Sequence, residues 1–168
     1  MEIILDQKDL ETRLDDLGEK LTKICNHEGG GIVFVCVMKG GFMFFSDLVK
    51  RIEYPIEVDF IRCSSYDGQA QQTLQIHTSV DVNVKGKTVF IVDDILDTGN
   101  TMNELVKHFI TLGAKGVETV AAIYKENEVL PNTFHIYKQP ENVNPWYVGY
   151  GMDDPKGYQR NLNKIKTL

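Results

Sequence analysis

The sequence lacks a long hydrophobic run. Nowhere does it contain about 18 consecutive apolar residues, the length that a membrane-spanning helix needs. The N-terminus, MEIILDQKDLETR, is acidic and has neither the basic start nor the apolar stretch of a secretory signal peptide. We therefore expect an intracellular, cytoplasmic protein that does not bind a membrane.

Cysteine is scarce, and its pattern excludes two kinds of site. Cys25, Cys36 and Cys63 lie far apart and form no C-x-x-C pair. Buried, reduced thiols are the expected state for such residues, and they suit a reducing compartment. The four histidines do not show the H-x-x-x-H or H-x-x-x-x-H spacing of a zinc site.

Positive charge is also in short supply. The chain carries 18 Lys and Arg against 24 Asp and Glu, a formal net charge of -6. A general nucleic-acid binder needs clustered basic residues, so we expect no nucleic-acid partner. A small anionic substrate remains compatible with this charge, because a metal ion and backbone amides can bind it locally.

Helical and strand-like segments alternate along the 168 residues. Apolar periodicity predicts helices over 10–24, 42–52 and 101–116, and strands over 31–38, 56–63, 87–94 and 117–125, with shorter strand-like pieces at 134–137 and 146–151. The polar segment 64–87 interrupts this order as a long excursion or mobile hairpin. This alternation predicts a single α/β domain, 1–168, with a parallel sheet flanked by helices.

Three carboxylates gather in the segment FIVDDILDTGNTM, residues 90–102. Asp93 and Asp94 follow an expected strand, Val89–Val92, and so lie at its carboxyl end, where open α/β sheets bind ligands. Because successive strand residues point to opposite faces, the two acids can share a ligand only if the strand ends or bends there.

The residues after the acids favour a phosphate. Thr101 and Glu104 have the spacing of a capping box, which predicts a helix start after the loop ILDTGN. Backbone amides at a helix start bind phosphate, and the hydroxyls of Thr98 and Thr101 add donors. Carboxylates for a diol beside amides for a phosphate indicate a sugar-phosphate site. Local caps and turns involving the three acids are the alternative.

The segment VFIVDDILDTGNTM resembles the phosphoribosyl-pyrophosphate (PRPP) signature of the type I phosphoribosyltransferases. Three more segments resemble the hypoxanthine-guanine branch of that family: VMKGGFMFFSDLVKRI, CSSYDG and WYVGYGMDDPKGYQRNL. The four segments occur in the family's order over about residues 32–162. The resemblance implies a core at about 10–137, a small hood formed by about 138–168 with the N-terminal residues, and a mobile loop at about 64–86.

The resemblance also implies roles for individual residues. The PRPP and 5′-phosphate site would comprise Asp93, Asp94, Asp97, Thr98, Gly99, Asn100 and Thr101. Pyrophosphate would be bound by Lys39, Gly40 and Arg160, with a cis peptide at Lys39–Gly40. The purine would contact Lys125, Trp146, Tyr147 and Asp153. The catalytic residues would be Asp97, as the general base near N7 of the purine, with Ser65 and Tyr66 from the mobile loop.

The resemblance further implies Mg²⁺ as cofactor, held by Asp93, Asp94 and Asp153, and a homodimer or homotetramer. The implied reaction transfers a phosphoribosyl group from PRPP to hypoxanthine, and to guanine as well. Two features depart from the branch: the acid pair is Asp-Asp where Glu-Asp is usual, and the loop after Tyr66 lacks the expected Ser-Ser-Gly. In addition, the segment ending at Arg160 is one residue longer than expected.

Three alternatives stay open at this point. The first is another base, such as xanthine, in the same enzyme class. The second is an RNA-binding regulator on the same fold, which the acidic charge disfavours. The third is a signalling receiver domain, in which the acid pair lies near the N-terminus instead of beyond position 90.

Overall fold

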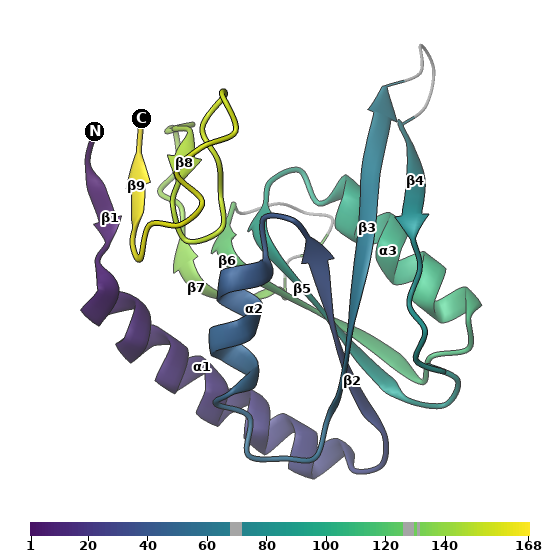
Figure 1. The fold of residues 1–168 in the computed structure, drawn as a ribbon. Coiled ribbons are helices and arrows are strands. Elements are labelled where there is room, and N and C mark those ends of the chain that lie inside the picture. The colour runs from purple at the N-terminus through teal and green to yellow at the C-terminus, as the bar shows by residue number, and fades with distance from the viewer. Residues whose placement is uncertain (68–71, 126–129, 131) are drawn as a thin grey trace.

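The structure, a computed structural model of the whole chain, describes residues 1–67, 72–125, 130 and 132–168. The side chains at 65–67, 72 and 73 are outside this description. Figure 1 shows a large sheet with helices on both faces and, at one end, a small sheet that contains both chain termini.

The large sheet has the strand order β4-β3-β2-β5-β6-β7 among the described residues. Its strands are β2 (Ile32–Met38), β3 (Glu57–Asp67), β4 (Gln72–Thr78), β5 (Thr88–Leu96), β6 (Gly116–Tyr124) and β7 (Phe134–Lys138). Neighbouring strands from β3 to β7 are parallel, and only β4 runs antiparallel, against β3. The predicted α/β fold is confirmed, but the sheet is mixed at one edge because the excursion after residue 64 returns as β4.

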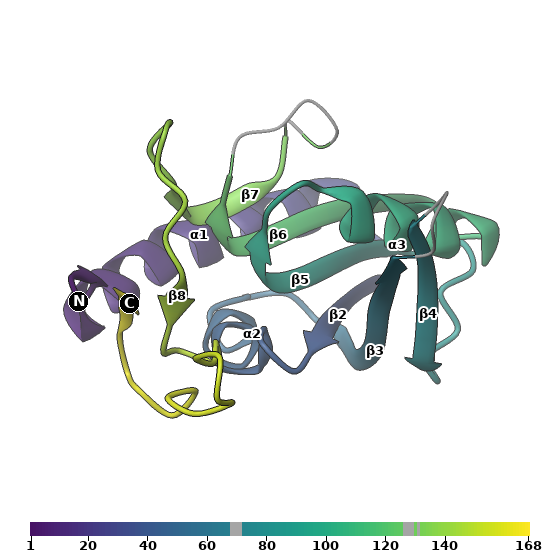
Figure 2. The same ribbon diagram turned by 90° about the horizontal axis from the view of Figure 1, so that it is seen from above.

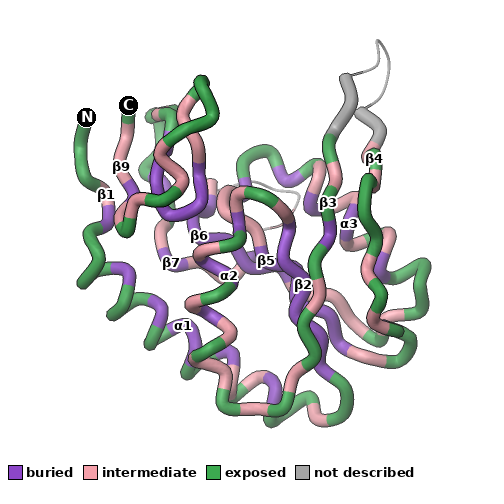
Figure 3. The backbone as a smooth tube through the Cα atoms, viewed as in Figure 1, coloured by how far each residue is buried: buried purple, intermediate pink, exposed green. Residues whose placement is uncertain are grey.

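Three helices cover this sheet among the described residues: α1 (Gln7–Glu28), α2 (Phe42–Val49) and α3 (Asn100–Thr111). Buried residues of α1 and α2 pack with Phe34 and Phe90, whose rings stack at 4.6 Å on one face. The alternate strand residues, such as Val33 and Val35, pack with α3 on the other face. Burial on both faces explains the continuous apolar runs of β2 and β5 (Figure 3). None of the described helices is long and apolar enough to cross a bilayer.

The small sheet has the order β1-β9-β8 and joins the two ends of the chain. Its strands are β1 (Ile3–Leu5), β8 (Tyr147–Val148) and β9 (Ile165–Thr167). The sequence predicted only β8, as the strand-like piece at 146–151, because strands of two or three residues carry almost no periodic signal. Figure 2 shows the small sheet at the end of the molecule opposite β3 and β4.

A partly buried hydrogen bond attaches the segment after β8 to the core. Tyr150 is 3% exposed, and its hydroxyl donates to Asp47 Oδ2 of α2 at 2.7 Å. Lys50 Nζ donates to the other carboxylate oxygen of Asp47 at 2.6 Å. Burial raises the pKa of Asp47, but the bonds from Lys50 and Tyr150 outweigh it and leave that pKa below its ordinary value. Asp47 therefore links α2 to the C-terminal part of the chain in its charged form.

Replacing Tyr150 by phenylalanine should lower the free energy of unfolding by about 1 kcal/mol at neutral pH, since a partly buried bond to a carboxylate is lost. A lowered folded-state pKa stabilises the protein above the ordinary carboxyl value of 3.8, and that stability is lost as the pH falls through the folded-state pKa. The difference between Tyr150→Phe and the parent should therefore shrink in strong acid. Urea unfolding at neutral and acidic pH measures both effects.

The matched control is Tyr158→Phe, because Tyr158 is 69% exposed. It should leave the unfolding midpoint unchanged. An equal loss in both variants would contradict the assignment of this stability to the Tyr150–Asp47 bond.

Candidate active site

The acid pair lies within β5, not after it. The sequence predicted that the strand ends or bends at the acids, whereas β5 continues to Leu96. However, the ladder between β5 and β2 ends at the pair Cys36–Val92, so the acids lie just beyond the contact with β2. Asp93 Oδ1 accepts from the amide of Asp94 at 2.8 Å. The two strands separate at the point where the carboxylates begin, which leaves room for a ligand.

The two carboxylates are close together and poorly neutralised. Burial, and then the charge of Asp94, hold the pKa of Asp93 well above its ordinary value. Burial, followed by the charges of both acids, also raises the pKa of the Cys36 thiol to about 12. Within the described part of the chain, no lysine or arginine forms an ion pair with Asp93 or Asp94. The pair therefore favours a ligand that brings positive charge or hydroxyl groups.

The turn between β2 and α2 lies against this pair. A Cβ placed on Gly40 would be 1.8 Å from Asp94 Oδ2, so only a glycine fits there without a shift. Lys39, before it, is exposed. The cis peptide bond is at Met38–Lys39, and the predicted position at Lys39–Gly40 is wrong by one residue. The sequence could not indicate where the cis bond lies, because cis peptide bonds usually precede proline and residue 39 is not a proline.

A second loop follows β5 and leads into α3. The helix begins at Asn100, its N-cap is Gly99, and no side chain caps it. The predicted capping box from Thr101 to Glu104 is therefore wrong, because Thr101 already lies in the first helical turn. Gly99 has φ of +79°, a conformation that glycine adopts easily, and α3 begins directly after this turn.

This loop surrounds a cavity of about 160 Å³. The cavity is lined by Asp93, Ile95, Leu96, Asp97, Thr98, Gly99, Thr101 and Met102. The first amides of a helix have no acceptor within the helix, and its dipole is positive at this end. Of the predicted phosphate-site residues, all but Asp94 and Asn100 line this cavity, which suits an anionic group beside Asp93. Asn100, at the start of α3, is exposed.

A larger cavity of about 420 Å³ lies on the other side of Asp97. It is lined by Asp94, Ile95, Asp97, Lys125, Asn144, Pro145, Trp146, Tyr147, Met152 and Asp153. Lys125 Nζ is 3.1 Å from Asp97 Oδ1. Trp146 is 55% exposed and is therefore not a core residue. Its indole Nε1 donates to the carbonyl of Asp153 at 2.9 Å, which fixes the ring at the edge of the cavity.

The residues predicted for the purine site thus line one cavity. Tyr147 lies there too, buried in β8, with its hydroxyl donating to Gln139 Oε1 at 3.0 Å. Asp153 forms an ion pair of 2.6 Å with Arg160, whose other terminal nitrogen donates to the carbonyl of Gly151 at 2.6 Å. The predicted metal ligand and the predicted pyrophosphate ligand are therefore direct partners here.

Ser65 and Tyr66 lie near the end of β3, paired with Leu74 and Thr73 of β4. The predicted hairpin is thus present. The tip at 68–71 and the side chains of Ser65 and Tyr66 fall outside the described residues, so their catalytic role and the mobility of this loop stay predictions.

Sequence reasoning missed two residues of the site. Asn144 lines the larger cavity and accepts from Lys125 Nζ at 2.8 Å. Gly151 packs on the turn after β2, since a Cβ there would be 2.1 Å from the carbonyl oxygen of Gly40. Both contacts join distant parts of the chain. In the sequence, the one sign of a close backbone contact at Gly151 was the pair of glycines on either side of Tyr150.

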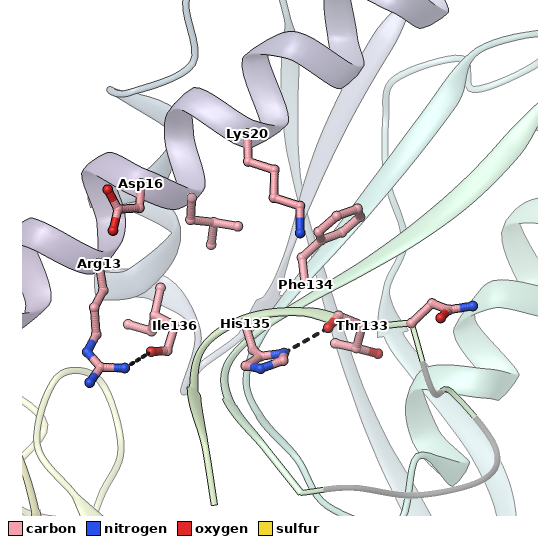
Figure 4. Close-up of a pocket in the computed structure, with 9 residues that line it drawn as sticks. Arg13, Asp16, Lys20, Thr133, Phe134, His135 and Ile136 are labelled. Atoms are coloured by element: carbon pink, nitrogen blue, oxygen red, sulfur yellow. Dashed lines mark hydrogen bonds between the residues drawn. The ribbon is translucent and has the colours of Figure 1, made fainter.

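A larger hollow of about 610 Å³ lies elsewhere, between α1 and β7 (Figure 4). Arg13 Nη1 donates to the carbonyl of Ile136 at 2.8 Å, and Lys20 Nζ lies 5.0 Å from the centre of the Phe134 ring. These contacts cover the edge of the large sheet, which protects it from pairing with another chain. The hollow is distant in the fold from the acid pair. We therefore assign its side chains to the protection of the edge strand and not to the site.

The two cavities at the end of β5 share Ile95 and Asp97. One suits an anionic group next to a diol, and the other offers a flat aromatic ring with a lysine. A ligand in each would meet beside Asp97. This arrangement suits a transfer between a sugar phosphate and a planar, polar ring, with Asp97 available to accept a proton.

Comparisons with known proteins agree with this geometry. Residues 6–155 match the phosphoribosyl transferase domain family. The chain is 33% identical to the hypoxanthine-guanine phosphoribosyltransferase of Staphylococcus aureus, covering 99% of this chain and 93% of that protein. The enzyme of Streptococcus thermophilus is also 33% identical, with 99% and 92% covered. A hypoxanthine-guanine phosphoribosyltransferase structure from Bacillus anthracis has a TM-score of 0.87 at 29% identity, covering 100% of this chain and 98% of that chain.

The chain belongs to the phosphoribosyltransferases and, within them, to the hypoxanthine-guanine branch. The resemblance and the fold predicted from the sequence are confirmed. The receiver-domain alternative is excluded by the same match.

The acid pair gives a prediction about stability. Asp93→Asn should raise the melting temperature at neutral pH in the presence of a chelator, because it removes a charge that burial and Asp94 disfavour. Since the folded-state pKa of Asp93 is raised, the parent loses stability as the pH rises from the ordinary value of 3.8 through that raised pKa. The advantage of Asp93→Asn should therefore grow over this range and vanish in acid.

Thermal unfolding at several pH values, with and without a divalent cation, provides the measurement. Asp16→Asn, an exposed acid of α1, is the control and should show no change. A variant less stable than the parent at neutral pH in chelator would show that the pair does not carry unfavourable charge.

Proposed function

We propose that this member of the hypoxanthine-guanine branch transfers the 5-phosphoribosyl group of PRPP to a 6-oxopurine, in the cytoplasm and for purine salvage. Hypoxanthine and guanine are the expected bases, and pyrophosphate leaves. The observation that carries the proposal is the meeting of two cavities at Asp97, one beside the start of α3 and the other containing Lys125 and Trp146.

The smaller cavity would bind the ribose phosphate. The amides of Gly99 and the first turn of α3 would bind the 5′-phosphate, with donors from Thr98, Asn100 and Thr101. The carboxylates of Asp93 and Asp94 would accept from the ribose 2′- and 3′-hydroxyls. The hydroxyl donors of the diol would thus stabilise the negatively charged carboxylates at the end of β5.

The turn after β2 would bind the pyrophosphate of PRPP. Gly40 brings its backbone against Asp94, and Lys39 adds an exposed cation. Arg160 lies near the same turn, because it donates to the carbonyl of Gly151, which packs on Gly40. These groups would neutralise the charge that develops on the leaving group.

Mg²⁺ would be held by Asp93 and Asp94. Among the described residues, no group of three or more metal-binding side chains occurs. Two adjacent carboxylates nevertheless fit this ion, which usually takes one or two carboxylates and completes its shell with water and substrate phosphates. The bound ion would supply charge neutralisation at the leaving pyrophosphate. Asp153 would assist with a second ion only after leaving its pair with Arg160.

The larger cavity would bind the purine. Trp146 would stack on the ring, Lys125 would donate to O6, and the backbone of Tyr147 would contact the ring edge. A fixed ammonium favours an oxygen at C6 over an amino group, because an ammonium can only donate. Asp97 would lie near N7 and accept its proton as the glycosidic bond forms, while the nearby carboxylates favour the cation-like ribose.

The small sheet, with the C-terminal residues 138–168, would act as the hood over the base, and the β3–β4 hairpin would bring Ser65 and Tyr66 over the reacting centre. We also include in this proposal a homodimer or homotetramer. Three large apolar side chains on α2 and β3 support a contact between copies: Phe42, Val58 and Phe60, which are 40%, 46% and 47% exposed.

A direct assay tests the function. The protein is mixed with Mg²⁺, PRPP and one of hypoxanthine, guanine, xanthine or adenine, and nucleotide formation is measured by chromatography. Nucleotide should form with hypoxanthine and guanine and not with adenine. Failure with every base would sink the proposal, and binding of RNA at moderate salt without turnover would favour the regulator on the same fold.

The role of Asp97 gives a second test. Asp97→Asn keeps the shape of the side chain but removes the proton acceptor, so the turnover number should fall by roughly 10²- to 10⁴-fold. The affinity for PRPP should change little, because the acid pair and the phosphate loop are intact. Steady-state kinetics and PRPP titration measure the two quantities, with Asp16→Asn as the matched control. Equal losses of turnover and PRPP affinity would show that Asp97 acts in binding instead.

A further inference from the structure

The ammonium of Lys125 is held from two sides. Asp97 Oδ1 lies 3.1 Å from Nζ, and Asn144 Oδ1 accepts from Nζ at 2.8 Å. Asp97 follows β5, whereas Asn144 lies between β7 and β8, so the lysine connects the large sheet to the C-terminal segment. The side chain of Lys125 is 15% exposed. Its amide also donates to the carbonyl of Leu96 at 2.9 Å, which fixes where the side chain begins.

The two partners act differently on the lysine. An ammonium group has only donors, so the Asn144 amide must present its oxygen to it. This oxygen is uncharged, and it orients the ammonium without cancelling its positive charge. The carboxylate of Asp97 does cancel it. Loss of the Asn144 oxygen would remove one orienting contact of the ammonium and leave the ion pair with Asp97 in place.

Asn144 shares the 420 Å³ cavity with Lys125, Asp97 and Trp146. We infer that Asn144 is a positioning residue, which holds the Lys125 ammonium towards the acceptor at C6 of the purine. The inference rests on the proposed function and adds to it a residue from outside the segments that carried the resemblance. It also predicts selectivity: Asn144 contributes to the affinity for ligands with an oxygen at C6 and not to the binding of the rest of the nucleotide.

Binding of two nucleotides separates this effect from a general one. Inosine 5′-monophosphate carries the C6 oxygen, and purine riboside 5′-monophosphate lacks any C6 substituent. Asn144→Leu removes the acceptor at similar volume and should weaken inosine 5′-monophosphate by about tenfold, the value of one well-formed hydrogen bond. The affinity for purine riboside 5′-monophosphate should stay the same. Isothermal calorimetry measures both.

Asn144→Asp tests whether the acceptor must be neutral. It keeps an oxygen at the same position but adds a second carboxylate beside the ammonium, so inosine 5′-monophosphate should again bind more weakly than to the parent, and purine riboside 5′-monophosphate should not. Asn26→Leu, the same substitution on the exposed side of α1, is the matched control and should bind both nucleotides like the parent.

Three outcomes would overturn the inference. In the first, Asn144→Leu weakens both nucleotides equally, which is the pattern of a purely structural role in the segment between β7 and β8. In the second, Asn144→Leu leaves both affinities unchanged. In the third, the parent binds neither nucleotide, and this result would remove the proposed function as well. The first two leave the proposed function standing, because the parent still binds inosine 5′-monophosphate.

Discussion

The uncompensated negative charge at the end of β5 is the constraint on which the rest of the site depends. Burial and mutual repulsion make Asp93 a weak acid, and the described basic residues do not pair with either member of the acid pair. Such a site is relieved by protonation or by a ligand or cation that brings positive charge. The turn after β2, the loop before α3 and the cavity beside Lys125 all adjoin one of these carboxylates or the neighbouring Asp97, so one strand end connects the parts of the candidate site.

The C-terminal segment reaches this strand end through three separate contacts. Tyr150 bonds to Asp47 of α2, Gly151 packs on Gly40, and Asn144 bonds to Lys125. The first is a partly buried structural bond, the second is a backbone contact, and the third lies inside the cavity. The C-terminal segment is therefore attached to α2, to the turn after β2 and to Lys125, and its position relative to the acid pair depends on several interactions acting together.

Sequence reasoning predicted the parts of this structure that depend on local pattern. The apolar runs of β2 and β5 and the periodicity of α1 appear where expected, because burial on one or two faces imposes a regular spacing. Asp97, Lys125 and Trp146 were predicted through the resemblance, and the cavity brings them together. Features that depend on contacts distant in the sequence were not predictable, such as the short strands of the small sheet and the role of Asn144. The predicted capping box was wrong because α3 begins at Asn100, after Gly99 in the left-handed conformation, and the sequence pattern alone does not locate that turn.

The glycine contacts have a consequence for how this site can change over evolutionary time. Gly40 lies between the acid pair and Gly151. Asp94 is close to it on one side, and on the other side its carbonyl group packs against Gly151. A methyl group at either position would need a displacement of more than an ångström to reach ordinary contact distance. Side chains that line the larger cavity can therefore be exchanged more easily than the glycines at positions 40 and 151. The distance between the acid pair and the C-terminal segment is set at this point by backbone atoms, whatever side chains surround it.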